Sequence, residues 1–360
     1  MKYFLSFLLI FCLSCIEQKS NFVQSQVIPS KIDSLETEVE IQSFVQKLQY
    51  PYYRYRDHDD SIKTHKTFEK FELKKIKDFD RDHRKDFDSL TKILADSIGV
   101  TNSFYKADID NNGFTDLVII GDDKSCTGAV PFEPNSTIYC DFSVYALMNF
   151  GNDSINPVNL MRLDFSGDAV VPKLYERNGK ISLKIYEAPK YSWFENEKIS
   201  DLKITELTYK HGTFVEKNHT PKIYKIEKIE YQTEPCYGNC PIFELTINND
   251  RTAFLNAIEY NSLEPNLWEY EISRELKGKF KAIITDEKYQ EIINLLNYLD
   301  FPTLENDYWL SATDMSGSKL KVTYNKGKIK TITDYGKKGT LGLIKVYDLI
   351  ENLRTNQEWK

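Results

Sequence analysis

The stretch KLKVTYNKGKIKTIT, residues 319–333, predicts an antiparallel β-hairpin. Apolar and polar side chains alternate before Asn325-Lys326-Gly327, and β-branched residues follow it, which is typical of half-buried strands. Asn and Gly tolerate the positive φ angles that tight hairpin turns need. Residues 242–248 and 252–258 have the same strand character around the turn Asn249-Asp250. The C-terminal part of the chain therefore predicts antiparallel sheet.

Helical patterns occur between strand segments along the whole chain. Helices are predicted at 34–49, in stretches of 65–98, at 286–299 and at 340–354, where apolar residues recur at helical spacing. Further strands are predicted at 103–107, 117–120, 142–149, 181–187, 202–209, 213–216 and 222–232. We therefore predict the α+β class, with domains at 34–220 and 221–360 that each pack helices on an antiparallel sheet.

The first fifteen residues, MKYFLSFLLIFCLSC, read as a secretory signal whose apolar core is too short to span a bilayer. A small residue directly before Cys15 resembles the lipobox of bacterial lipoproteins, although Cys12 stands where that motif usually has Leu. The resemblance implies removal of 1–14 and a diacylglycerol on Cys15. The alternative is an ordinary signal peptide with a chance cysteine. Residues 15–33 would then be the lipidated cysteine and a flexible polar tether.

Composition limits the class of protein further. Hydrophobic residues make up 41% and aromatic residues 13% of the 360, which fits a folded chain. The net charge is −7, and both signs are interspersed, which argues against nucleic acid as a partner. No later segment has the ~20 apolar residues that a membrane-spanning helix needs. Membrane attachment would therefore depend on the lipid at Cys15. Residue 16 is Ile, not the Asp that would resemble an inner-membrane retention signal, so the outer membrane is favoured. The sequence does not decide between its periplasmic side and the cell surface.

Four cysteines remain in the exported chain: Cys126, Cys140, Cys236 and Cys240. An even number in an oxidising compartment indicates disulfides, and four cysteines allow three connectivities. Local pairing within each predicted domain, Cys126 with Cys140 and Cys236 with Cys240, is favoured. The alternative is four buried free thiols.

The segment Asp108–Asp116 carries the strongest chemical motif, D-x-D-x-N-G-x-x-D. Oxygen atoms at loop positions 1, 3, 5, 7 and 9 converge when such a loop coils tightly, and hard oxygen ligands suit Ca²⁺. The predicted ligands are Asp108, Asp110, Asn112, the backbone carbonyl of Phe114, and Asp116. The alternative is an Asx-rich turn without metal.

An EF-hand would have Glu at position 12, where this chain has Ile119 inside an apolar strand. The loop instead resembles the calcium loops of FG-GAP or VCBS-type extracellular repeats, which run straight into a strand. A second acidic run at 78–86 has His83 in place of the glycine and reads as a charged helix. We therefore predict one calcium loop and no propeller.

The second distinctive motif is P-C-x-G-x-C-P at 235–241, between two predicted strands. With Cys236, Gly238, Cys240 and Pro241 as its core, the stretch 223–359 resembles an uncharacterised domain of unknown function in Gram-negative envelope lipoproteins. That resemblance implies architecture and an envelope location, and no activity. A thiol–disulfide role is disfavoured because three residues separate the cysteines and no helix is predicted after them.

No nucleophile elbow, P-loop, dinucleotide fingerprint or zinc-protease motif is present. Our first hypothesis is a non-enzymatic, lipid-anchored envelope protein with a structural Ca²⁺ and a module that binds an envelope protein or a glycan. The alternative is an envelope enzyme, a hydrolase or a thiol–disulfide protein, with a site scattered in sequence. Trp193, Trp268 and Trp309 suggest an aromatic sugar platform, but core packing is favoured for each.

Overall fold

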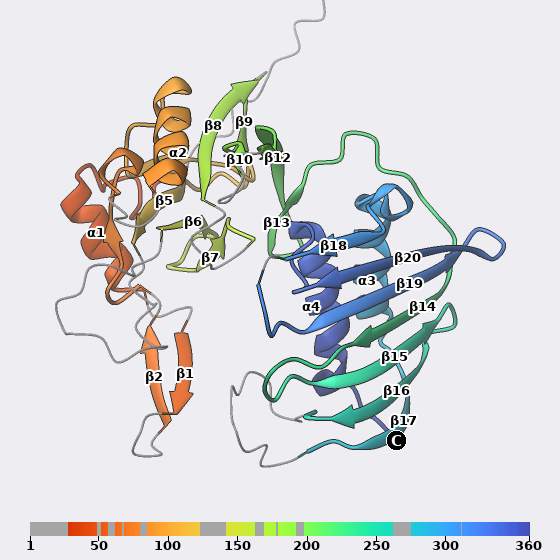
Figure 1. Ribbon diagram of the computed structural model, residues 1–360. Helices are drawn as coiled ribbons and strands as arrows, with labels where there is room; N and C mark the ends of the chain where they lie inside the picture. Colours follow the sequence, from red (N-terminus) through yellow and green to blue (C-terminus); the bar gives the residue numbers. More distant parts are fainter. Residues whose placement is uncertain are drawn as a thin grey trace, which may run out of the picture.

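A computed structural model describes most of the chain (Figure 1). The described residues are 28–48, 52–56, 62–66, 68–79, 85–122, 142–162, 169–177, 179–191, 198–261, 275–310 and 312–360. The predicted signal peptide, Cys15, Cys126 and Cys140 lie outside them, as do Trp193 and Trp268. In the part of the chain that the structure describes, no helix is both long and apolar enough to cross a membrane.

The predicted fold class is wrong. The structure is mostly β-sheet, with 41% strand against 20% helix, and it does not consist of two domains that each pack helices on a sheet. The largest departures lie near the N-terminus. Tyr52–Arg56 (β1) and Ile62–Lys66 (β2) form an antiparallel pair where we predicted a loop and the start of a helix. Tyr, Ile and Thr favour strands, and pairing with a partner outweighs the helical composition of such a short segment.

Three sheets and two helices make up most of the remaining N-terminal part. The helices are α1 (Glu38–Gln46) and α2 (Lys85–Ser97), with a 3₁₀ turn η1 (Ile76–Asp78) between them. One sheet contains β3 (Glu72–Leu73), β4 (Phe104–Ala107), β5 (Asp116–Asp122), β6 (Phe142–Asn149) and β7 (Ile155–Asn159). The second contains β8 (Val170–Arg177), β9 (Lys180–Glu187), β12 (Lys203–Lys210) and β13 (Thr213–Glu216). The third is the short pair β10 (Lys190–Tyr191) and β11 (Lys198–Ser200).

A seven-stranded sheet follows, in the order β17-β16-β15-β14-β19-β20-β18. Its strands are β14 (Ile226–Thr233), β15 (Ile242–Asn248), β16 (Thr252–Glu259), β17 (Gly278–Ile283), β18 (Asp307–Trp309), β19 (Gly317–Tyr324) and β20 (Lys328–Tyr335). The hairpin predicted at 319–333 forms as β19 and β20. Neighbouring strands are antiparallel except β18 and β20, which are parallel.

Two helices cover one face of this sheet (Figure 1). They are α3 (Asp286–Tyr298) and α4 (Leu341–Asn356), and the 3₁₀ turn η2 (Phe301–Thr303) follows α3. Alternate strand residues, such as Leu245, Leu320 and Ile332, point into a core shared with Ile292 and Val346. No helix of the described residues covers the opposite face of the sheet (Figure 1).

Strand β13 joins the N-terminal sheets to these helices. The carboxylate of Glu216, at the end of β13, accepts hydrogen bonds from the backbone N–H groups of Leu341 (2.7 Å) and Gly342 (2.9 Å) at the start of α4. These amides have no partner within the helix, and a carboxylate also compensates the positive end of the helix dipole. Arg162 adds a bond from Nη1 to the carbonyl of Gly339 (2.8 Å).

Replacing Glu216 with Gln should therefore destabilise the protein. The amide removes the charge and one of the two acceptors, at a cost of about 1–3 kcal/mol. The measurement is the thermal unfolding midpoint, with Glu176→Gln, an exposed glutamate on β8, as the matched control. Equal midpoints for the two variants would contradict the role that we give Glu216.

Candidate functional site: the acidic loop and the disulfide loop

The acidic loop is the turn of a β-hairpin. Strands β4 and β5 pair antiparallel, with Ala107 opposite Asp116, so residues 108–115 connect their ends. Asn111 and Gly113 adopt φ angles of 61° and 90°, in the left-handed region that Asn and Gly tolerate best. These two residues let the chain coil back on itself within a short loop.

The coil brings three carboxylates together. One oxygen from each of Asp108, Asp110 and Asp116 lies within 4.8 Å of the others. Asp116 is completely buried, and its Oδ2 and Oδ1 accept hydrogen bonds from the N–H groups of Ile109 and Asn149, both at 2.8 Å. The carboxylate of Asp108 accepts from the N–H groups of Asn112 and Gly113, both at 2.9 Å. The loop is therefore fixed by its own acidic side chains.

The other two predicted ligands take different positions. Asn112 lies beside the cluster, and its Nδ2 donates to Asp110 Oδ2 (3.2 Å) and to the carbonyl of Asn149 (2.8 Å). The Oδ1 atom of Asn112 accepts from the N–H of Phe114 at 2.8 Å. The structure therefore brings Asp108, Asp110 and Asp116 together and sets Asn112 next to them, whereas Phe114 contacts the loop through its N–H.

Sequence reasoning missed Asn149, which holds the loop from the neighbouring strand β6. Its side chain is buried, donates to the carbonyl of Thr115 (3.1 Å) and accepts from the N–H of Gly151 (3.0 Å). The signal for a turn after Asn149 was present in the run Phe150-Gly151-Asn152-Asp153. Its contact with the acidic loop depends on the register of β5 and β6, which pairs Leu117 with Leu147.

The segment 28–33, predicted as the end of the flexible tether, also contacts this hairpin. The N–H of Ile28 donates to the carbonyl of Gly113 (2.7 Å), and the hydroxyl of Thr115 donates to Asp33 Oδ1. The ammonium of Lys106 on β4 donates to the carbonyls of Asp33 (3.1 Å) and Leu35 (2.8 Å). The N-terminal segment therefore enters the folded part of the chain directly beside the acidic loop.

Burial and mutual repulsion disfavour the ionised forms of Asp110 and Asp116 in the cluster. Burial raises the pKa of Asp116 to about 7, and the negative charges of Asp110 and Asp108 raise it further. The two backbone N–H bonds lower this pKa, but they do not offset the rise. Burial, and then Asp108, also raises the pKa of Asp110. Three carboxylates this close repel one another unless a proton or a cation lies among them.

A hard divalent cation fits this donor set. The donors are carboxylate oxygens, which Ca²⁺ and Mg²⁺ prefer over nitrogen or sulfur. The buried position of Asp116 supports the fit, because a cation beside it would compensate a charge that is removed from water.

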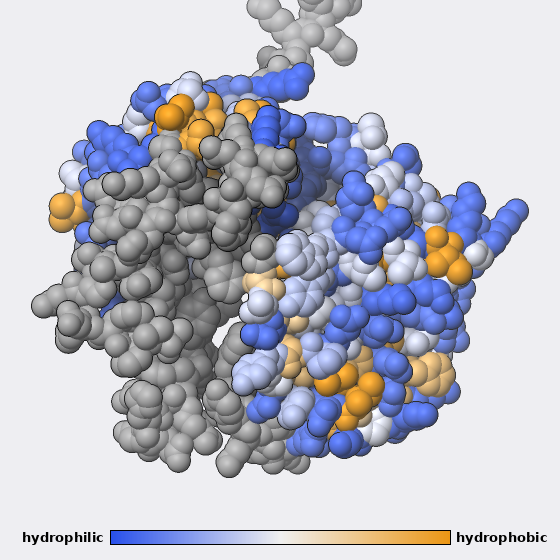
Figure 2. All heavy atoms as spheres, viewed as in Figure 1, coloured by the Kyte–Doolittle hydropathy of each residue, from blue (hydrophilic) through white to orange (hydrophobic). Residues whose placement is uncertain are grey.

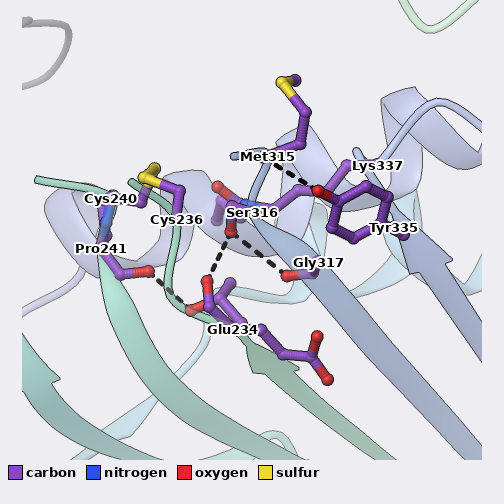
Figure 3. Close-up of a disulfide and its surroundings, with 11 residues drawn as sticks. Glu234, Cys236, Cys240, Pro241, Met315, Ser316, Gly317, Tyr335 and Lys337 are labelled. Carbon is purple, nitrogen blue, oxygen red and sulfur yellow. Dashed lines mark hydrogen bonds and ion pairs between the residues drawn. A yellow bond between two sulfur atoms is a disulfide. The ribbon is translucent and has the colours of Figure 1, made fainter. Parts of the chain in front are cut away.

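The disulfide loop connects β14 to β15, at one end of the seven-stranded sheet (Figure 3). Cys236 and Cys240, the pair that local pairing favoured, are joined with an S–S distance of 1.91 Å and Cα atoms 5.8 Å apart. Strand β15 begins at Ile242, directly after the loop, so no helix starts at either cysteine. The helix N-terminus that lowers the thiol pKa in many redox proteins is therefore missing from this loop.

Hydrogen bonds attach the disulfide loop to the segment before β19. The N–H of Tyr237 donates to the carbonyl of Asp314 (3.2 Å), and the hydroxyl of Ser316 donates to the carbonyl of Glu234 (2.7 Å). Thr233 Oγ1 donates to the carbonyl of Pro241 (2.7 Å) across the base of the loop. These bonds, with the disulfide, make the loop a clip between the ends of β14, β15 and β19.

Comparison with known protein families finds a match in the second part of the chain. Residues 227–354 contain a domain of unknown function (DUF6438), which runs from β14 to α4. This supports the predicted resemblance of 223–359 to an uncharacterised domain family. No curated protein and no solved structure matches the chain.

The raised pKa of Asp116 predicts a pH dependence for the metal-free protein. The folded state binds a proton at Asp116 up to about pH 7, whereas the unfolded state releases it near the ordinary aspartate pKa of 3.8. The stabilisation from this proton is complete below about pH 4 and is lost as the pH rises toward 7. In a chelator, the unfolding midpoint should therefore fall by several degrees between about pH 5 and pH 8.

The variant Asp116→Asn isolates this effect, because an amide does not titrate. It should have a flatter dependence of the midpoint on pH than the wild type. A slope that is the same in both proteins would show that Asp116 is ionised over the whole range.

Proposed function

We propose that this protein is a lipid-anchored protein of the cell envelope that carries a structural Ca²⁺ in the acidic loop and a binding module in its DUF6438 domain. The observation that carries the calcium part is the convergence of three carboxylates around Asp116, which is completely buried. The anchor rests on the sequence alone, through the lipobox resemblance at Cys15.

Asp108, Asp110 and Asp116 would hold the ion, with Asn112 and the carbonyl of Phe114 as the further ligands that the loop motif suggests. Ca²⁺ would supply the positive charge that the three carboxylates need. The chain's own part is to position them: β4 and β5 set the ends of the loop, and the N–H groups of Ile109 and Asn149 orient Asp116. A ligand that binds only the folded state adds its binding energy to stability.

The position of the N-terminal segment gives such an ion a second effect. Ile28 and Asp33 bond to Gly113 and Thr115, within or next to the loop that Ca²⁺ would order. A lipid on Cys15 would pull on the folded protein through this segment. Ordering of the loop would therefore strengthen the point at which the tether meets the fold.

Calcium should stabilise the protein in a way that depends on Asp110. At free Ca²⁺ about a hundred times its Kd, the gain is about 3 kcal/mol, or several degrees in the unfolding midpoint. Asp110→Ala should remove most of this gain. Asp96→Ala, an exposed aspartate on α2, is the control and should keep it. A midpoint that Ca²⁺ leaves unchanged in the wild type, together with an unaltered Asp110→Ala variant, would sink the calcium proposal.

The anchor has its own test in a Gram-negative host. The mature protein should lack residues 1–14, gain the mass of a diacylglycerol and an acyl chain, and sediment with membranes, because two or more chains anchor stably. Cys15→Ser should remain an unlipidated precursor, and Cys12→Ser is the control that should still be lipidated. An intact mass without lipid in the wild type would leave an ordinary signal peptide as the correct reading.

A further inference from the structure

Trp309 lies on the surface, and the prediction that it packs in a core is wrong. Its side chain is 75% exposed, at the end of β18 on the edge of the seven-stranded sheet. An indole ring is the largest apolar surface that a side chain offers, and exposing most of it costs free energy. A binding role for the ring would explain why a tryptophan on an ordered strand is left exposed.

The ring stands on the face of the sheet that is left open by α3, α4 and the other helices that the structure describes. Ile332 and Asp334 on β20 are buried toward the helices, so Thr333 and Tyr335 point to the opposite face. Trp309 pairs with Tyr335 in the parallel register, and the two rings stack with centroids 6.4 Å apart and planes inclined by 19°. Figure 2 shows this open face, on which hydrophilic side chains predominate around small apolar patches.

Polar groups of both signs border the aromatic pair. Tyr335 lies opposite Gly317, and the carboxylate of Glu234 occupies the space above that glycine, 2.5 Å from where a Cβ would stand. One step along the strands, Asp307 accepts a hydrogen bond from the hydroxyl of Thr333. Lys319 pairs with Thr333 on β20, and its side chain is exposed.

The tyrosine of the pair is held in place from the disulfide side. Its hydroxyl accepts a hydrogen bond from the N–H of Met315 (3.3 Å), in the segment to which Tyr237 of the disulfide loop also bonds (Figure 3). The clip between β14, β15 and β19 therefore fixes the surroundings of the platform. A fixed ring loses little conformational entropy when a ligand stacks on it.

This arrangement matches the chemistry of a sugar ring. A pyranose has a flat face of C–H groups that stacks on an aromatic ring, and hydroxyls at its edge that both donate and accept hydrogen bonds. Carboxylates of Glu234 and Asp307 accept such bonds, and Lys319 donates them. The bordering charges are of both signs. The two carboxylates would repel a strongly anionic ligand, and Lys319 would repel a strongly cationic one, so the site favours a neutral ligand.

We propose that Trp309 and Tyr335 form the stacking platform of a binding site for a neutral oligosaccharide on the open face of the DUF6438 domain. The inference deepens the proposed binding role of this domain and is independent of the Ca²⁺ loop and the lipid anchor. Among the partners that the sequence left open, it selects a glycan over a protein.

The test is binding of oligosaccharides to the full chain, solubilised in detergent where it is lipidated. A glycan array that includes neutral β-linked hexasaccharides of glucose and of N-acetylglucosamine finds the ligand, and titration calorimetry measures its affinity. Trp309→Ala should weaken binding at least about tenfold, because a stacked tryptophan is typically a main contributor to binding. Phe254→Ala is the control: Phe254 is 45% exposed on the same face of the sheet, on β16.

A saturable interaction that Trp309→Ala weakens and Phe254→Ala preserves, with unfolding midpoints equal to that of the wild type, supports the proposal. Glu234→Gln should lower the affinity by a smaller factor, because it removes one charged acceptor and leaves the platform intact. An array without any neutral glycan bound, an affinity unchanged in Trp309→Ala, or a peptide or charged ligand bound at Trp309 instead would each overturn it. Calcium stabilisation and lipidation that persist in such a case show that only the glycan assignment has failed.

Discussion

The carboxylate of Asp116 is completely buried, and backbone N–H groups from two separate segments bond to its two oxygens. This one side chain ties the start of β5 to the acidic loop on one side and to the end of β6 on the other. A buried charge of this kind requires compensation, and the hydrogen bonds do not supply all of it, since the pKa remains raised to about 7. The loop, the Asn149 turn and the N-terminal segment at Ile28 are arranged around this requirement.

A second carboxylate plays the corresponding part between the two halves of the chain. Glu216 ends the last strand before the DUF6438 domain and bonds to the start of α4, the helix that completes that domain's core. Val215, one residue earlier, is buried in the same core as the seven-stranded sheet. Strand β13 therefore belongs to an N-terminal sheet and also packs in the core of the DUF6438 domain.

Sequence reasoning succeeded where structure is decided locally. The hairpin of β19 and β20 and the helices α3 and α4 lie close to their predicted bounds, because alternation, turn residues and the N-caps Thr285 and Thr340 act within a few residues. The acidic loop was also found from its motif, since its three carboxylates lie within nine residues.

The failures involve contacts between residues far apart in the sequence. The fold class was wrong because short segments such as β1 and β2 became strands through pairing rather than propensity. Asn149 reaches the acidic loop through the register of β5 and β6, and Trp309 is exposed because the parallel pairing of β18 with β20 sets it at an edge. No period in the sequence encodes these pairings. The pairing of Cys126 with Cys140, outside the described residues, stays a prediction.

The most direct measurement for the central claim is an anomalous difference map from crystals of the protein soaked in terbium, a stand-in for Ca²⁺ with strong anomalous scattering. The account predicts a peak at the acidic loop, about 2.3–2.6 Å from oxygens of Asp108, Asp110 and Asp116, that fades when Ca²⁺ competes. A loop that holds no peak, with the three carboxylates bridged by hydrogen bonds alone, would contradict it.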